Sequence, residues 1–180
     1  MVLRLEDLDP DRCRREYSDQ IMRDLEWLGL DWDGQPVYQS QRTEEYAAAF
    51  RELEKQGLIY PCFCTRAERL AASAPHRSDG TAVYDGQCAR LSAAERAELS
   101  RRRRPAWRVR VPEEVVSFTD LLQGSYSQNL ARDCGDFILC RSDGVFAYQL
   151  AVVADDAAMG VTQVVRGSDL LSSAPRQMWL

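Results

Sequence analysis

The sequence lacks the features of membrane, exported and repeat proteins. In its 180 residues, no apolar run approaches the roughly 20 residues that a membrane-spanning helix needs. The opening segment, MVLRLEDLDP, is acidic and has no apolar stretch of the signal-peptide kind. There is also no internal repeat and no low-complexity tract. We therefore expect a globular cytoplasmic protein that does not contact a membrane.

Lysine and histidine are nearly absent, since Lys55 and His76 are the only examples. Arginine carries almost all of the positive charge, and the net charge is −5 at pH 7. Contact with nucleic-acid phosphates requires a concentrated positive patch, so this balance argues against broad, unspecific nucleic-acid binding. The run RRRR at 101–104 is interpreted as a solvated helix end, with phosphate contact as the alternative.

Hydrophobic periodicity predicts a chain that mixes helices and strands. Asp9 and Pro10 should open a first helix as N-cap and first helical residue, and Gly29 should end it. A second helix is expected at 43–55, and Gly57 follows it. Later segments predict a helix in SAAERAELSRRRR, strands in AWRVRV, VVSF and DFILC, and a buried parallel strand in VTQVV. By its period alone FAYQLAVVADDAAMG could be a buried strand or a buried helix, and its length favours a helix.

The segment 60–104 differs in character from its flanks. It contains a cysteine cluster, a polar stretch around SAPHRSDGT and one short helix. We interpret it as a small insertion between residues 1–59 and 105–180, which together would form one α/β domain.

Three of the six cysteines have the spacing of a metal site. Cys62 and Cys64 are too close for an easy mutual disulfide, and Cys88 can return across the polar loop as a third ligand. Zinc prefers four ligands in a tetrahedron, thiolates above all. The fourth ligand would be Tyr84, His76, an acidic side chain or water.

A metal there would be structural, because a small insertion has little core of its own. The alternative is that Cys62 and Cys64 are small core residues. The remaining cysteines, Cys13, Cys134 and Cys140, are expected to be buried apolar residues.

Three stretches together resemble the glutamyl branch of class I aminoacyl-tRNA synthetases. They are LRLEDLDP at 3–10, YPCFC at 60–64 and FAYQLAVVADDAAMGVTQVVRGSDLLSSAPRQ at 146–177. Ordinary glutamyl-tRNA synthetases tend to have a histidine after the RG-acidic turn, whereas this chain has RGSDLL at 166–171. That form, with FAYQL and the CxC…YxxxC pattern, is similar to glutamyl-queuosine tRNA(Asp) synthetases.

This resemblance implies a doubly wound, Rossmann-type catalytic domain with a zinc-bearing insertion. The family's zinc ligands match Cys62, Cys64, Tyr84 and Cys88, which selects Tyr84 over His76. The family enzyme uses ATP, with Mg²⁺ expected, to convert L-glutamate to glutamyl-adenylate. It then transfers glutamate to the queuosine base in the anticodon of tRNA(Asp), and a monomer is expected.

Glu6, Tyr148 and Arg166 are the residues that the resemblance assigns to the glutamate pocket. Glu6 would accept hydrogen bonds from the ammonium group, Arg166 would pair with a carboxylate, and the Tyr148 hydroxyl would orient the substrate. No general base or nucleophile is expected, because the substrate carboxylate itself attacks the α-phosphate.

The family's two ATP motifs, an HxGH turn and a KMSKS-like loop, fall outside this sequence. We therefore expect the domain to be incomplete at both ends, and the chain alone not to form adenylate. The alternatives are a fragment of an ordinary glutamyl-tRNA synthetase, or an inactive, zinc-stabilised binding module.

Overall fold

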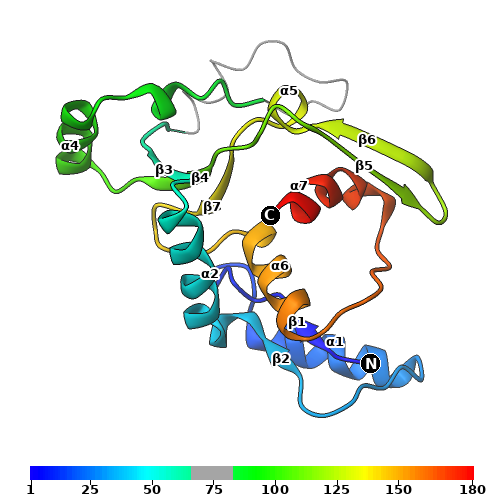
Figure 1. Ribbon diagram of the computed structural model, residues 1–180. Coiled ribbons are helices and arrows are strands. Elements are labelled where there is room, and N and C mark those ends of the chain that lie inside the picture. Colours follow the sequence, from blue (N-terminus) through cyan, green and yellow to red (C-terminus); the bar gives the residue numbers. More distant parts are fainter. Residues whose placement is uncertain (66–82) are drawn as a thin grey trace. The chain divides into compact units, whose positions relative to one another are not determined.

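The computed structural model describes residues 1–65 and 83–180 (Figure 1). His76 and the polar stretch around it lie outside the described residues. The chain forms two compact units, residues 1–47 and 48–180, and the boundary falls within helix α2 (Thr43–Lys55). In the described part of the chain, no helix has both the length and the apolar character needed to cross a membrane.

The first unit is built on a strand–helix–strand arrangement. Its elements are β1 (Arg4–Leu5), α1 (Arg15–Trp27), β2 (Val37–Tyr38) and the 3-10 helix η1 (Gln39–Gln41), followed by the start of α2. β1 and β2 pair in parallel, and the helix connects them, as parallel strands require. The carboxylate of Asp7 accepts hydrogen bonds from the backbone N–H and the hydroxyl of Ser40, at 2.9 and 2.7 Å. The segments that follow the two strands are thus held together.

The first helix begins later than the sequence predicts. Asp9 and Pro10 form a separate turn, in which the backbone N–H groups of Arg12 and Cys13 donate to the Asp9 carbonyl at 3.1 and 2.8 Å. Aspartate and proline favour turns as strongly as helix starts, so the motif alone does not distinguish the two. The predicted end is confirmed, because Gly29 adopts a left-handed φ of +73° just after the helix.

The second unit is organised around an antiparallel three-stranded sheet. Its strands lie in the order β3 (Ile59–Cys62), β4 (Ala106–Val109) and β7 (Phe137–Cys140). Val109, Leu139 and Leu150 form the buried centre of one cluster, and Phe50 of α2 and Phe146 pack against it. Leu150 comes from α6 (Tyr148–Ala158), so this helix and the sheet share one core.

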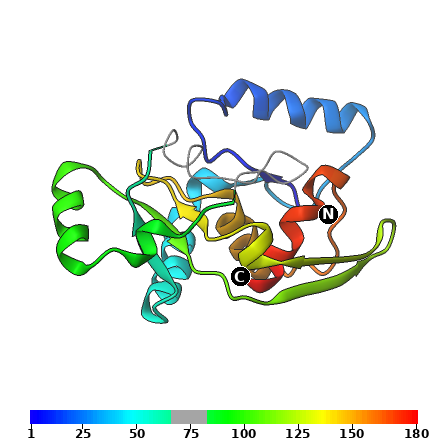
Figure 2. The same ribbon diagram turned by 90° about the horizontal axis from the view of Figure 1, so that it is seen from above.

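A second pair of strands, β5 (Val115–Asp120) and β6 (Gly124–Asn129), forms a hairpin that extends beyond the sheet, away from α4 (Ala93–Arg102), in both views (Figures 1 and 2). Its strands β5 and β6 pair from Val115↔Asn129 to Asp120↔Gly124. The remaining elements of this unit are η2 (Gln87–Arg90), α5 (Leu130–Asp133), η3 (Ser168–Ser173) and α7 (Ala174–Trp179).

Most predicted elements of the second unit are confirmed, namely α4, α6, β4, β5 and β7. The parallel strand predicted in VTQVV is wrong, because residues 161–167 have no regular structure and Val165 is 93% exposed. A parallel strand needs a neighbour to complete its hydrogen-bond ladder, and none of the described strands pairs with this segment. Among the described strands, β1 and β2 are the only parallel pair.

Gly135 places α5 and β7 directly against the segment that contains Tyr84. Its φ is +65°, and a Cβ built there would lie 2.7 Å from the Tyr84 carbonyl oxygen and 3.1 Å from the Tyr84 nitrogen. Both contacts are with backbone, which cannot rotate away as a side chain can. Glycine is therefore required here for its conformation and for its size.

We predict that Gly135→Ala destabilises the second unit more than Gly160→Ala does. Gly160 has the same φ of +65°, but a Cβ there would meet nothing within 4 Å, so it is a matched control. Both variants should incur about 1–2 kcal/mol of left-handed backbone strain. Overpacking against Tyr84 should add about 1–3 kcal/mol at Gly135 alone. Denaturant unfolding of both variants measures the difference, and equal losses would show that the close approach is unimportant.

Candidate metal centre

Cys62, Cys64 and Cys88 converge at one end of the three-stranded sheet. Cys62 is the last residue of β3, Cys64 follows two residues later, and Cys88 lies in η2. Their sulfur atoms all lie within 4.8 Å of one another, and the Sγ atoms of Cys64 and Cys88 are 3.3 Å apart. All six cysteines of the chain are free thiols.

The phenol of Tyr84 completes this group. Its hydroxyl lies 3.6 Å from the sulfur of Cys62 and 3.6 Å from that of Cys64. It also accepts a hydrogen bond from the backbone N–H of Cys88 at 3.0 Å. The structure thus brings together the side chains that the resemblance names, three sulfurs and one oxygen; Cys62, Cys64, Tyr84 and Cys88 are called the metal group below.

The thiols differ in their readiness to ionise. Burial alone would raise the pKa of Cys62, but hydrogen bonds from Arg108 and the Cys64 backbone, with the charge of Arg108, lower it. Burial, together with its hydrogen bond to Cys88 and the nearby thiol charges, raises the pKa of Cys64 to about 12. Burial and its hydrogen bond to Cys88 also raise the pKa of the Tyr84 phenol. Hydrogen bonds and the charge of Arg108 thus favour ionisation of Cys62, whereas the surroundings of Cys64 oppose its ionisation.

The group fits a thiophilic divalent metal. Thiolates crowded into a half-buried cluster repel one another, and a metal cation removes that repulsion. Around the sulfurs the core is small, with Tyr60 and Phe63 buried and Leu91 and Leu99 packed against them. With so little apolar packing, metal–ligand bonds would contribute much of the local stability.

Arg108 of β4 is the functional residue that the sequence does not reveal. It is only 5% exposed, and its Nε donates a hydrogen bond to the Cys62 sulfur at 3.3 Å. Its guanidinium carbon lies 3.8 Å from the centre of the Tyr84 ring, and Nη1 donates to the backbone carbonyl of Asp136. A single buried cation therefore orients two members of the metal group.

Asp136 joins this group to the sheet. One carboxylate oxygen accepts a hydrogen bond from the Tyr60 hydroxyl at 2.5 Å, and the other accepts from the Val111 backbone N–H at 2.9 Å. Tyr60 precedes Cys62 on β3, while Val111 follows β4. The network thus fixes the register of the sheet where the metal group is attached.

The residues assigned to the glutamate pocket are distributed over both units. Glu6 follows β1 in the first unit, where it accepts a hydrogen bond from Arg4 at 3.3 Å. Tyr148 is the first residue of α6, and Nη1 of Arg166 donates to Oε1 of Gln177 at 2.7 Å. In the described part of the chain, no hydrogen bond joins Tyr148 to Arg166.

The other cysteines agree only partly with the prediction of buried apolar residues. Cys140 is buried at the end of β7, whereas Cys13 and Cys134 are half-buried. Cys134 packs against the core cluster that contains Leu139. Cys13 is closer to the surface because it lies in the turn before α1.

We predict that Arg108→Met weakens the binding of a divalent metal such as Zn²⁺. Methionine retains an apolar stem but loses the donor to Cys62 and the positive charge. Residues that orient a metal ligand are worth about 10–100-fold in affinity, so we expect a loss in that range. Competition with a chelator gives the affinity directly.

Arg110→Met is the matched control for this experiment. Arg110 lies two residues further along; its guanidinium stacks on the Tyr60 ring at 4.7 Å and donates to the Ala89 carbonyl at 3.4 Å, and it bonds to no cysteine of the described residues. Its replacement should leave the metal affinity within about twofold of the parent, as for a residue outside the ligand shell. Equal losses in both variants would mean that Arg108 acts only through general charge.

Comparison with known proteins relates this chain to a family. The model for tRNA synthetases class I (E and Q), catalytic domain, matches residues 1–180. A Glutamyl-Q tRNA(Asp) synthetase of Nitratidesulfovibrio vulgaris is 52% identical over 190 aligned residues, which cover 100% of this chain and 59% of that protein. A protein of the same name from Geobacter sulfurreducens is 51% identical, covering 99% of this chain and 55% of its own. The chain thus spans less than three fifths of the length of these relatives.

Solved structures agree on the fold. A glutamate tRNA ligase from Elizabethkingia meningosepticum, in complex with its amino acid, superposes with a TM-score of 0.82 at 26% identity. The match covers 99% of this chain and 39% of that protein. A glutamate-tRNA synthetase from Elizabethkingia anophelis gives a TM-score of 0.83 with the same coverage. These neighbours confirm the Rossmann-like fold class, and the chain belongs to the catalytic-domain family of class I tRNA synthetases of the E and Q type.

Proposed function

We propose that this chain is the central part of a cytoplasmic, monomeric glutamyl-queuosine tRNA(Asp) synthetase. The complete enzyme would activate L-glutamate with ATP and transfer it to the queuosine base in the anticodon of tRNA(Asp). The observation that carries the proposal is the 52% identity along the whole chain to a relative of that name. The solved glutamate tRNA ligases are only 26% identical, which makes an ordinary glutamyl-tRNA synthetase the weaker alternative.

Arg166 is proposed to bind a carboxylate of glutamate. Its guanidinium is held by Gln177, a residue of α7, so it is oriented before any ligand arrives. Buried Nε2 of Gln177 has no hydrogen-bond partner within the described residues. A buried donor without a partner is rare in folded proteins, and a bound polar ligand would satisfy it.

Tyr148 and Glu6 would complete the recognition of the substrate. Tyr148 is half-buried at the start of α6, a rigid position from which its hydroxyl can orient glutamate. Glu6 would accept from the ammonium group, replacing its present contact with Arg4. A ligand without these groups would leave polar atoms unpaired, which is how such a pocket rejects it.

Catalysis would depend on positioning and charge stabilisation. The glutamate carboxylate attacks the α-phosphate of ATP, pyrophosphate leaves, and glutamyl-adenylate forms. None of Glu6, Tyr148 and Arg166 accepts or donates a proton in this step. ATP would require Mg²⁺ to offset the charge of its phosphates.

We further propose that the metal is zinc, held in a structural site within an insertion comprising residues 60–104. Three thiolates and one oxygen donor are a set that zinc accepts readily in tetrahedral geometry. The ligands would be Cys62, Cys64, Tyr84 and Cys88, which lie together in the structure. No position is left for a substrate, which is typical of structural sites.

Elemental analysis should find about one zinc per chain in freshly purified protein, as expected for a single tetrahedral site. Replacing Cys62 and Cys64 together by serine should abolish retention of the metal, because serine is a far poorer ligand. Cys140→Ser is the control, since Cys140 is buried but belongs to no cluster of metal-ligand side chains among the described residues. Metal-free parent protein that unfolds like the loaded form would overturn the assignment.

The proposed activity is tested on a version of the protein extended to the length of its relatives. We expect it to attach labelled glutamate to tRNA(Asp) that carries queuosine, and to leave tRNA(Glu) and queuosine-free tRNA(Asp) uncharged. Robust charging of tRNA(Glu) would select the ordinary synthetase instead. ATP–pyrophosphate exchange with glutamate reports the first step separately.

Arg166→Ala, in the same extended protein, tests the pocket. Loss of a carboxylate–guanidinium pair should reduce glutamate-dependent exchange by about 100-fold or more, since charged hydrogen bonds at a binding site are worth several kcal/mol. Arg132→Ala removes an exposed arginine from α5 and should have no such effect. Near-normal exchange in Arg166→Ala would contradict the assigned role.

A further inference from the structure

The arginine run at 101–104 divides into two pairs with different environments. Arg101 and Arg102 are the last residues of α4, and both bind the carboxylate of Glu98, at 3.2 and 2.8 Å. Pairs spaced three or four residues apart on an exposed helix are ordinary surface ion pairs. For these two arginines, the interpretation as a solvated helix end is confirmed.

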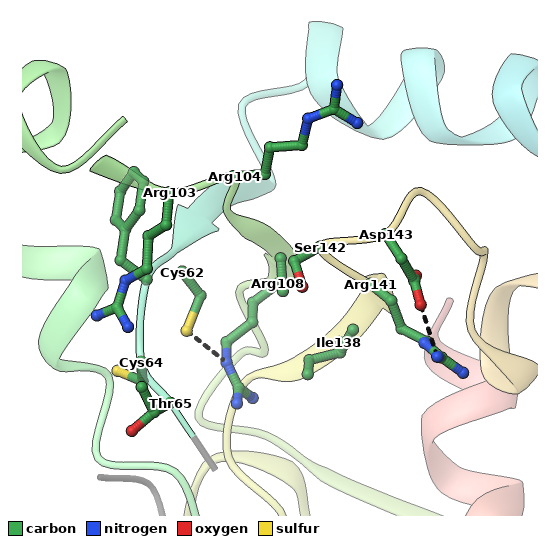
Figure 3. Close-up of a pocket in the computed structure, with 12 residues that line it drawn as sticks. Cys62, Cys64, Thr65, Arg103, Arg104, Arg108, Ile138, Arg141, Ser142 and Asp143 are labelled. Carbon is green, nitrogen blue, oxygen red and sulfur yellow. Dashed lines mark hydrogen bonds and ion pairs between the residues drawn. The ribbon is translucent and has the colours of Figure 1, made fainter. Parts of the chain in front are cut away.

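Arg103 and Arg104 leave the helix and line a pocket. Arg103 is extended, with φ −156° and ψ 152°, so it turns the chain away from the axis of α4. The pocket has a volume of about 380 Å³, and it is also lined by Arg108, Arg141 and Asp143. Figure 3 shows Arg103 and Arg104 diverging at its edge, with Arg108 pointing toward the Cys62 sulfur.

Arginines outnumber acidic side chains among the described residues that line this pocket. Four guanidinium groups line it, and Asp143, paired with Arg141 at 2.6 Å, is the only carboxylate among the described residues that line it. Arg108 contacts Cys62 and Tyr84, so its buried charge adds to the positive potential of the pocket without being available to a ligand. Arg103 and Arg104 are exposed, and Arg104 has no ion-pair partner among the described residues. This concentration contrasts with the net charge of −5 for the whole chain.

We infer that this pocket, with Arg103 and Arg104 at its edge, binds the phosphodiester backbone of the RNA substrate. Guanidinium groups match phosphate oxygens in a bidentate geometry, and a positive pocket concentrates the attraction. Successive residues of an extended segment point to opposite sides, so the two arginines contact neighbouring phosphates rather than one. The identification of RNA rests on the function proposed above, because a tRNA is the polyanionic substrate of that reaction.

Two double variants provide a matched comparison in the chain of 180 residues, loaded with zinc. Arg103→Ala with Arg104→Ala removes the pair at the pocket, whereas Arg101→Ala with Arg102→Ala removes the pair bound to Glu98. Both doubles remove two positive charges within four consecutive residues. The probe is a fluorescently labelled, unmodified RNA hairpin with the sequence of the tRNA(Asp) anticodon arm. Fluorescence anisotropy gives its affinity at several salt concentrations.

We expect the pocket double to weaken RNA binding by about tenfold or more, and to lower the slope of log K against log salt by about two. The helix-end double should change the affinity by less than about twofold, because exposed ion pairs contribute little. Zinc retention and thermal unfolding of both doubles check that the fold and the metal group are unchanged. Equal weakening in the two doubles, or an unchanged pocket double, would overturn the inference.

A second arm distinguishes RNA from small phosphates. Inorganic phosphate replaces chloride at constant ionic strength in the same titration. Modest displacement of RNA, no greater in the parent than in the pocket double, supports a site for extended phosphodiester. Strong binding of phosphate alone, without any effect of the pocket double on RNA, would make this a small-anion site and overturn the inference.

These measurements use neither ATP, glutamate nor queuosine. Phosphate contacts carry no sequence information, so the unmodified hairpin is a sufficient probe. A failure of the charging experiment would therefore leave the expected difference between the two doubles intact. Conversely, an extended enzyme that charges tRNA(Asp) equally well with either double would refute the pocket and not the activity.

Discussion

The buried guanidinium of Arg108 is the interaction on which the second unit depends. A charge removed from water is costly unless it is paired and hydrogen-bonded. Here the sulfur of Cys62, the ring of Tyr84 and the carbonyl of Asp136 surround the guanidinium. Because these partners come from three separate segments, the arginine is satisfied only when all three are in place. The metal group, the sheet and the loop before β7 are therefore formed together.

The sequence predicts well those features that depend on residues close together in the chain. Residues within and just after the helix at 43–55 determine where it begins and ends. It has acidic residues in its first turn, an apolar stripe and Gly57 beyond its end. The cysteine cluster was predictable because thiols two residues apart are a metal-site pattern in any fold. The role of Arg108 could not be predicted. It lies in the alternating pattern of AWRVRV like any strand residue, and its partner Cys62 is 46 residues away in the sequence. A cation in a strand indicates a solvent-facing side chain unless its long-range partners are known.

The two incorrect predictions of secondary structure have a related cause. Asp9 and Pro10 favour a turn and a helix start equally, and contacts outside the motif decide between them. The segment VTQVV has β-branched residues, yet a strand is defined by its neighbour, and here Val164 and Val165 are exposed. Both errors concern tertiary context, while the helices with complete internal signals, α2 and α4, agree with expectation. Ser92 and Glu95 form a capping box at α4, which makes that helix nearly independent of its surroundings.

Because α4 ends at Arg102 through its own hydrogen bonds, the first and second pairs of the arginine run have different environments. A helix fixed by its own cap ends where its hydrogen bonds end, so Glu98 can reach Arg101 and Arg102 but not the residues beyond. Arg103 and Arg104 are then directed by β4, which begins at Ala106 and carries Arg108 to the Cys62 sulfur. The metal group, by holding the end of β3 against β4, also fixes the wall of the pocket that these arginines line. The metal site proposed above would have no open ligand position, so it would contribute to the proposed RNA binding by positioning arginines, with no chemistry of its own.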